Sequence, residues 1–154
     1  MRFSHQVQYA LYGVFDLAYN GRGDPVQVRV ISERQSIPLR YLEQIFQRLR
    51  RGKIVRGKRG PGGGYQLARD PGRITLRQII EAVEGPIGGS TQPGDGEGGA
   101  EQGISSPAQP EFVWPLLADR IGESLDSFSV AELCRIASLQ GVPRADEGAQ
   151  DYQI

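Results

Sequence analysis

Basic side chains are concentrated in one part of the chain, where they could bind a polyanion. Residues 22–77 contain 14 Lys and Arg against four Asp and Glu, whereas residues 78–154 contain three against 13. One part of the 154-residue chain therefore carries a charge of +10 and the other −10, although the formal net charge is zero. Clustered basic residues are typical of nucleic-acid-binding surfaces, but they also solvate ordinary helices. Charge alone leaves both interpretations open.

The residue types needed for most catalytic and metal sites are scarce. The sequence has one Cys, Cys134, and one His, His5, so a disulfide framework or a multi-cysteine metal site cannot be built within one chain. The glycine-rich residues 60–64 do not form a phosphate-binding loop, because no Gly-Lys-Ser/Thr follows them and they precede a strand. We therefore expect a protein that is not an enzyme. Cys134 is expected to be a buried structural thiol, with a redox role as the alternative.

A helix with a polar, mostly basic face is predicted for residues 38–51. Its apolar residues recur every three or four positions, and a glycine follows its last turn. The outward side chains near its start combine donors and acceptors suited to base edges in the DNA major groove. Glu43 is informative, because a carboxylate repels phosphates but can accept from the N4 amino group of cytosine. We predict base contacts from Arg40, Tyr41, Glu43 and Gln44.

A β-hairpin is predicted directly after this helix. Two β-prone segments, residues 54–59 and 65–68, flank a turn rich in Gly and Pro. Arg59 at the tip is expected to enter the minor groove, where the potential is most negative. Nearby basic side chains would bind phosphates, and glycines would let the backbone approach DNA closely. We predict DNA-backbone contacts from Arg48, Arg51, Lys53, Lys58, Gly60, Gly62, Gly63 and Arg69.

The elements that position these residues have the order of a winged helix-turn-helix domain. A first helix runs from Ser4 to about Asn20, and a short second helix ends near Ser36, after the β-branched stretch 26–30. The basic helix and the hairpin follow, and a fourth helix then begins at Thr75 and runs over residues 76–84. We therefore predict that residues 1–84 form a mainly α DNA-binding domain whose β-hairpin is the wing.

Beyond this domain the composition changes twice. Residues 85–110 contain eight Gly and few bulky apolar residues, which predicts a flexible linker. Helical periodicity returns over residues 111–138, as a long helix and a final short one, and residues 139–154 are expected to fray. A long apolar-faced helix beyond a linker needs a partner, and a homodimer is the simplest, because helix-turn-helix proteins usually present two recognition helices to DNA. The predicted dimerisation residues are Leu116, Leu117, Ile121 and Leu125.

Several segments together resemble the Rrf2 family of winged-helix transcription regulators, which includes IscR, NsrR and CymR. The most specific is the string Arg-Gly-Pro-Gly-Gly-Gly-Tyr at residues 59–65; the others are residues 9–11, 41–46, 49–52, 74–76 and 83–86. The resemblance covers residues 3–86 closely and 111–138 loosely. It implies a homodimer with crossed long C-terminal helices, the third helix in the major groove and the wing in the minor groove. The positions at which members contact DNA correspond to Arg40, Tyr41, Glu43 and Arg59.

The sequence departs from the cluster-binding members of that family. Those members carry three cysteines after the Glu-Gly-Pro of residues 84–86, together with a fourth His, Asp or Glu ligand. Here residues 88–110 contain no Cys, and Glu111, which aligns with a ligand of some members, cannot hold an iron–sulfur cluster alone. We therefore expect no cofactor, and a regulatory protein partner is one possible source of the signal.

The expected cellular location of the protein is inferred from the apolar segments and the N-terminal residues of the sequence. No apolar run approaches the ~20 residues that span a bilayer, and no signal-peptide pattern opens the chain. We expect a cytoplasmic, bacterial-type homodimer that binds a double-stranded DNA operator and no membrane. The alternative is a protein-interaction module that regulates a partner enzyme through the same winged scaffold. The sequence leaves open the operator, the signal, and whether transcription is repressed or activated.

Overall fold

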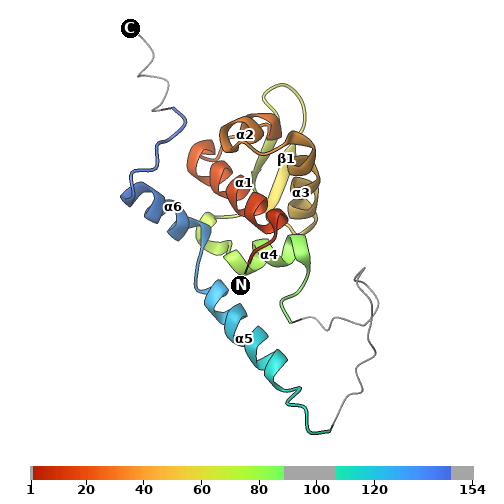
Figure 1. The fold of residues 1–154 in the computed structure, drawn as a ribbon. Helices are drawn as coiled ribbons and strands as arrows, with labels where there is room; N and C mark the ends of the chain where they lie inside the picture. The colour runs from red at the N-terminus through yellow and green to blue at the C-terminus, as the bar shows by residue number, and fades with distance from the viewer. Residues whose placement is uncertain (1, 89–106, 147–154) are drawn as a thin grey trace.

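The computed structural model describes residues 2–88 and 107–146, and it confirms a mainly helical winged helix-turn-helix fold (Figure 1). These residues form six α-helices and one hairpin in the predicted order. The elements are α1 (His5–Gly21), α2 (Val28–Gln35), α3 (Leu39–Arg51), β1 (Val55–Lys58), β2 (Gly64–Leu67), the 3₁₀ turn η1 (Pro71–Arg73), α4 (Leu76–Glu84), α5 (Val113–Asp126) and α6 (Val130–Leu139).

Polar side chains cap the N-termini of three of the helices. Ser4 accepts a hydrogen bond from the first turn of α1, and Ser129 does the same for α6. Thr75 and Gln78 form a reciprocal capping box at the start of α4. Each of these side chains satisfies backbone N–H groups that have no partner within the helix.

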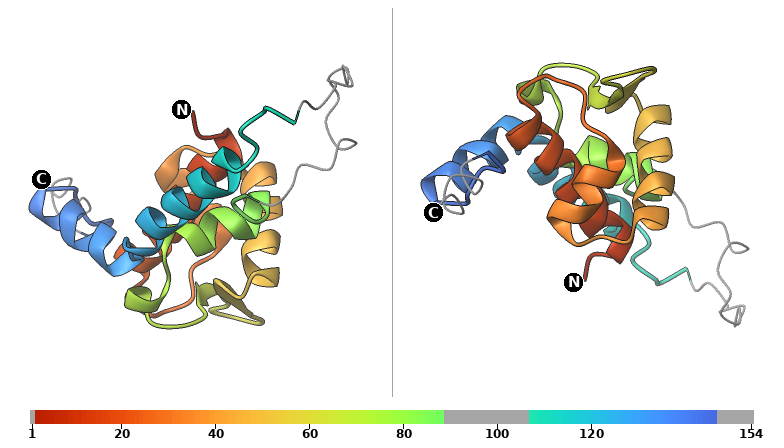
Figure 2. Two further views of the ribbon diagram at one scale, coloured as in Figure 1. Left: turned by 90° about the horizontal axis from the view of Figure 1, so that it is seen from below. Right: turned by 90° about the horizontal axis from the view of Figure 1, so that it is seen from above.

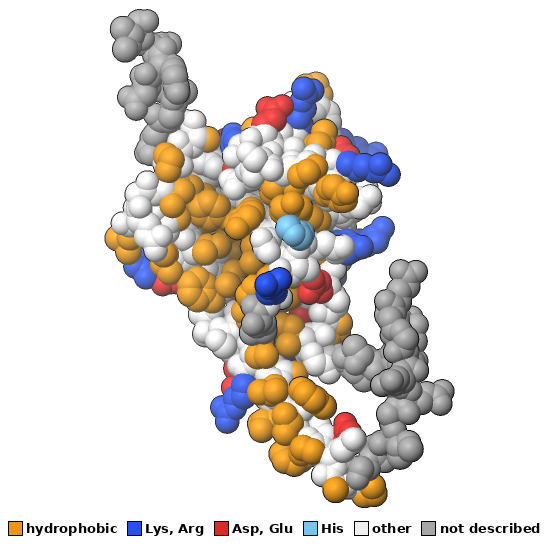
Figure 3. Space-filling view, in the orientation of Figure 1, with side chains coloured by type: hydrophobic (Ala, Val, Ile, Leu, Met, Phe, Trp, Pro, Cys, Tyr) orange, Lys and Arg blue, Asp and Glu red, His pale blue; other side chains and the backbone are white. Residues whose placement is uncertain are grey.

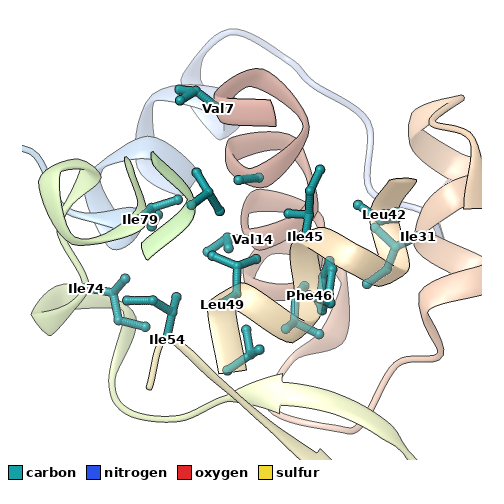
Figure 4. Packing of buried hydrophobic residues seen from close by; sticks show 14 of the residues in the cluster. Val7, Val14, Ile31, Leu42, Ile45, Phe46, Leu49, Ile54, Ile74 and Ile79 are labelled. Atoms are coloured by element: carbon teal, nitrogen blue, oxygen red, sulfur yellow. The ribbon is translucent and has the colours of Figure 1, made fainter. Parts of the chain in front are cut away.

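The apolar core lies around α1, which contacts α2, α3, α4 and α6 (Figures 1 and 2). Figure 4 shows Leu42, Phe46 and Leu49 of α3 in one buried cluster with Val14 of α1 and Ile79 of α4. Each of these five side chains is buried. Because α3 packs into the core along one side, its opposite side is presented to solvent in a fixed orientation.

The hairpin is antiparallel and is anchored to the start of the helix-turn-helix. Val55 pairs with Leu67, and Lys58 pairs with Gly64. Val26 pairs with Tyr65 through two backbone hydrogen bonds of 2.9 and 2.8 Å. The β-branched stretch 26–30 is therefore strand-like at Val26, while α2 already begins two residues later.

The C-terminal helices attach to the domain through α4 and α1. α5 packs against α4, where Arg77 Nη1 lies 3.0 Å from Asp126 Oδ2, and its first turns extend away from the domain (Figure 1). α6 packs against α1. Of the predicted flexible linker 85–110, residues 89–106 lie outside the described residues, so that interpretation stays a prediction.

The segment after α6 differs from the predicted frayed tail as far as the structure describes it. Residues 142–146, which we call the C-terminal strap, lie against the end of α1, where Tyr19 Oη donates to the Val142 carbonyl oxygen at 2.9 Å. The sequence did not reveal these contacts, because the Val142 carbonyl, the Arg144 side chain and the Ala145 N–H have partners on Tyr19 and Asn20, which lie far away in the sequence. Residues 147–154 lie outside the described residues.

Candidate nucleic-acid interface

A tight turn between α2 and α3 sets the angle at which α3 is presented. Ser36 has a φ of 53°, and the Ile37 N–H donates to the Ser32 carbonyl oxygen at 3.0 Å. The hydroxyl of Ser32 donates to the Ile37 carbonyl oxygen at 2.6 Å. Ile37 itself is buried. The turn is thus closed by hydrogen bonds and one apolar anchor, and α2 and α3 form a helix-turn-helix pair.

A buried carboxylate that the sequence analysis missed holds α2 on α1. Asp16 of α1 is 0% exposed, and its Oδ1 accepts from Arg34 Nη1 of α2 at 3.1 Å. Its Oδ2 accepts from Gln35 Nε2 at 2.9 Å and from Asn20 Nδ2 at 3.1 Å. A buried charge is tolerated when it is paired and fully hydrogen-bonded. The signal in the sequence was an acidic residue that interrupts the apolar stretch of the first helix.

The exposed face of α3 carries the side chains predicted to contact bases. Leu42, Ile45, Phe46 and Leu49 are buried on the opposite face. Tyr41 is 59% exposed, and its exposed neighbours lie on the same turns of the helix. The structure therefore brings together on one accessible surface the four residues Arg40, Tyr41, Glu43 and Gln44.

The wing is fixed at its base and open at its tip. Tyr65 packs on Phe46 with ring centroids 5.0 Å apart. A Cβ atom at Gly64 would lie 2.4 Å from the Val26 carbonyl oxygen, so the base of the wing requires glycine. Arg59 is exposed, and the turn beside it uses the positive φ of Gly60, 91°. The other predicted glycines of this turn are Gly62 and Gly63.

The basic side chains of α3 and the wing have no ion-pair partner within residues 2–88 and 107–146, whereas six Arg side chains elsewhere do. Glu43 is the one acidic residue of the segment 39–69. Figure 3 shows Lys and Arg side chains along the side of the molecule that α3 and the wing occupy. Unpaired positive charge on one surface attracts a polyanion. The exposed cations are Arg40, Arg48, Arg50, Arg51, Lys53, Arg56, Lys58 and Arg59.

Arg69, a predicted phosphate contact, also makes hydrogen bonds within the fold. Its Nη1 donates to the Lys53 carbonyl oxygen at 2.6 Å, and its Nη2 donates to Gln78 Oε1 at 2.8 Å. Its Nε donates to the Arg73 carbonyl oxygen at 3.3 Å. All three nitrogens of the guanidinium are used to tie the end of α3 to α4. These three hydrogen bonds use three of the five N–H groups of the guanidinium, so a phosphate contact from Arg69 stays a prediction.

Arg48 makes structural hydrogen bonds and also lies beside the exposed face of α3. Its Nη1 donates to Gln6 Oε1 at 2.6 Å and to the Val83 carbonyl oxygen at 3.0 Å. Arg48 also lines a hollow with His5 and Tyr9, between the start of α1 and the exposed face of α3. One guanidinium nitrogen makes both hydrogen bonds, so Arg48 remains a candidate for a phosphate contact.

The four predicted dimerisation residues differ in exposure. Leu116 and Leu117 are exposed, whereas Ile121 and Leu125 are half-buried. Leu125 packs against the core of its own chain. The exposed apolar part of α5 therefore lies toward its N-terminal end, where Trp114 is 68% exposed.

Side chains that could bind a metal are dispersed in the described part of the chain. Within residues 2–88 and 107–146, no group of three or more His, Cys, Asp or Glu side chains could hold a metal ion. The single cysteine, Cys134, is half-buried on α6 against the core, and burial raises the pKa of its thiol. A raised pKa leaves less of the thiolate that binds metals and reacts.

No helix in the described ranges is long and apolar enough to cross a membrane.

Comparisons with known proteins agree on one family. The Rrf2 family, described as an iron-dependent transcriptional regulator, matches residues 3–136. The HTH-type transcriptional regulator IscR of Salmonella agona is 36% identical over 160 aligned residues, covering 98% of this chain and 95% of the relative.

Solved structures show the same relationship. CymR, the global cysteine regulator of B. subtilis, superposes with a TM-score of 0.68 and 31% identity, covering 88% of this chain and 98% of that chain. IscR of T. potens superposes with a TM-score of 0.69 and 30% identity, covering 94% of each chain.

Proposed function

The chain belongs to the Rrf2 family of transcriptional regulators, and from this premise we propose that it is a homodimer that binds a double-stranded DNA operator, with α3 in the major groove and the wing in the minor groove. The relatives are named as transcriptional regulators, which is a non-enzymatic class. The observation that carries the proposal is the unpaired positive charge that α3 and the wing share. We place the protein in the cytoplasm, where a bacterial-type regulator meets DNA.

A salt series is the direct test of this proposal. A protein that neutralises Z phosphates shows a slope of about −0.9Z when log affinity is plotted against log salt concentration. We expect a steep negative slope with a mixed-sequence DNA duplex, and tighter binding to duplexes selected from a random-sequence library. Absence of binding to any duplex, together with co-purification of one stoichiometric partner, would favour the protein-interaction module instead.

The role of the wing is tested by removing its exposed arginine. Arg59→Ala is expected to weaken binding to a selected duplex by about 1–3 kcal/mol, because an arginine in a narrow minor groove interacts with a strongly negative potential. Arg120→Ala, on α5 and outside the candidate surface, is the matched control and should change affinity little. Equal affinities for wild type and Arg59→Ala would contradict the minor-groove assignment.

The homodimer is proposed from two apolar surfaces of the chain. α5 exposes Leu116 and Leu117, and a groove between α1 and α6 is lined by Leu11, Phe15 and Ile136. Figure 3 shows hydrophobic side chains gathered over both regions. Exposed apolar patches of this kind mark interaction surfaces, and symmetric association of two copies is the commonest way to cover them.

We further propose that the protein receives its signal without an iron–sulfur cluster. The chain has one Cys, and a cluster is held by several cysteine thiolates. Protein purified anaerobically should be colourless and free of iron. Brown, iron-loaded protein would overturn this proposal, and it would mean that ligands such as Cys134, His5 and Glu111 meet across the dimer.

A further inference from the structure

A hollow between α3 and the wing is bordered by basic side chains from both elements. Arg50, in the last turn of α3, faces it from one side, and Lys58 and Arg59 of the hairpin face it from the other. Gln27, which precedes α2, completes the rim. The lining includes no Asp or Glu, and none of the three cations has an ion-pair partner among the described residues. The hollow is therefore suited to an anion.

The lining of the hollow leaves room for an extended anion. Four of its lining residues are wing glycines, which contribute backbone and no side chain. The backbone groups of Val26 and Tyr65 beside it are already paired with each other. A broad chain of charged groups, such as a sugar–phosphate backbone, can approach such a surface without meeting side chains.

The place of the hollow matches the path that one DNA strand would take. A recognition helix in the major groove and a wing in the adjacent minor groove lie on either side of the sugar–phosphate strand that separates the two grooves. That strand must cross the space between α3 and the wing. The hollow occupies this space and carries positive charge on both of its walls.

We propose that the hollow seats the DNA strand between the two grooves and that Arg50 is a phosphate-binding residue that holds it. This inference rests on the proposed function, because it assumes that α3 and the wing occupy neighbouring grooves. Arg50 is suited to the role because its planar guanidinium can bind two phosphate oxygens at once. Lys58 opposes it across the hollow as a second positive charge.

A phosphate contact of this kind has a measurable signature that a base contact lacks. Arg50→Gln should lower affinity by about the same factor, roughly threefold to tenfold, for a selected duplex and for a mixed-sequence duplex. It should also reduce the magnitude of the salt slope of the homodimer by about 1.8, which corresponds to one phosphate for each protomer. Arg50→Lys, which keeps the charge, should restore the slope. Arg120→Gln on α5 makes the same change in net charge and should leave the slope unchanged.

Ethylation interference locates the contact on the selected duplex. With wild type, ethylation of one phosphate in each half-site, in the strand between the two grooves, should block binding. With Arg50→Gln, the same ethylation should add little further loss. If the wild type shows a steep slope and Arg50→Gln keeps that slope and that interference pattern, Arg50 is not the phosphate contact. If the wild type itself binds no duplex, the proposed function fails first, so the two failures are distinguishable.

Discussion

Asp16 connects α1 and α2 through one buried carboxylate. Its two oxygens accept hydrogen bonds from Arg34 and Gln35 of α2 and from Asn20 one turn further along α1. The side chain of Arg34 is 31% exposed, so its charge stays partly hydrated while the carboxylate does not. Because α2 carries the turn that presents α3, the orientation of the candidate DNA-binding helix depends on this residue.

Replacement of Asp16 tests that dependence. Asp16→Ala should lower the free energy of unfolding by about 3 kcal/mol, because it leaves several donors without their acceptor. Asp16→Asn, which retains one acceptor oxygen, should lose less. Glu33→Ala, which breaks the exposed Arg29–Glu33 pair, is the control and should change stability by no more than about 0.5 kcal/mol. Urea denaturation measures all three variants. Equal losses for Asp16→Ala and Glu33→Ala would show that the buried network is not stabilising.

Single residues were predictable from the sequence where the helical period decides their position. The exposed face of α3 follows from its apolar spacing, so Arg40 and Glu43 are exposed as expected. The hydrogen-bond partners of Arg69 were not predictable, because they depend on the positions of η1 and α4 in the folded structure. The partners of Asp16 depend in the same way on the angle between α1 and α2.

At the scale of elements, the C-terminal strap joins the segment that follows α6 to the end of α1. The guanidinium of Arg144 lies 4.2 Å from the ring centroid of Tyr19, and the Ala145 N–H donates to Asn20 Oδ1 at 2.9 Å. The amide nitrogen of the same Asn20 donates to Asp16. The strap is thus continuous, through hydrogen bonds, with the network that holds α2.

Loss of the strap contact should destabilise the domain. Arg144→Ala removes the stacking on Tyr19 and is expected to lower the free energy of unfolding by about 1–2 kcal/mol. Arg22→Ala removes the neighbouring pair with Asp146, whose side chains are 62% and 57% exposed, and should change stability by about 0.5 kcal/mol or less. Thermal unfolding of both variants gives the comparison. The strap would be energetically neutral if Arg144→Ala and wild type melted together.

Elements with local signals were predicted well, and elements held by distant contacts were not. The helix starts at Ser4 and Thr75 have local signals, and the structure places α1 and α4 directly after them. The stretch 26–30 has β-branched residues, yet burial of Ile31 against the core favours a helix from Val28 onward. A propensity of this kind is weaker than the packing that overrides it.

At the scale of the whole molecule, the positively charged surface and the exposed apolar surfaces lie on different elements. Unpaired positive charge lies on α3 and the wing, whereas apolar side chains are exposed along the first half of α5 and in the groove between α1 and α6. The order of elements was sufficient to predict the winged fold. The sequence could not show which part of α5 is free, because Leu125 and Leu117 belong to the same apolar stripe and only the packing of α5 on α4 distinguishes them.

The proposed homodimer therefore depends on the exposed half of α5. Leu117→Glu places a charge in that apolar surface and should yield a protein with the mass of one chain, measured by light scattering at a concentration where the wild type is a dimer. A monomer presents half of the DNA contacts, so the magnitude of its salt slope should fall about twofold. Asp119→Asn also changes the charge of α5 by one unit, from an exposed polar position, and should remain a dimer. Circular dichroism shows whether Leu117→Glu keeps its helices. A folded Leu117→Glu protein that remains dimeric would place the interface elsewhere.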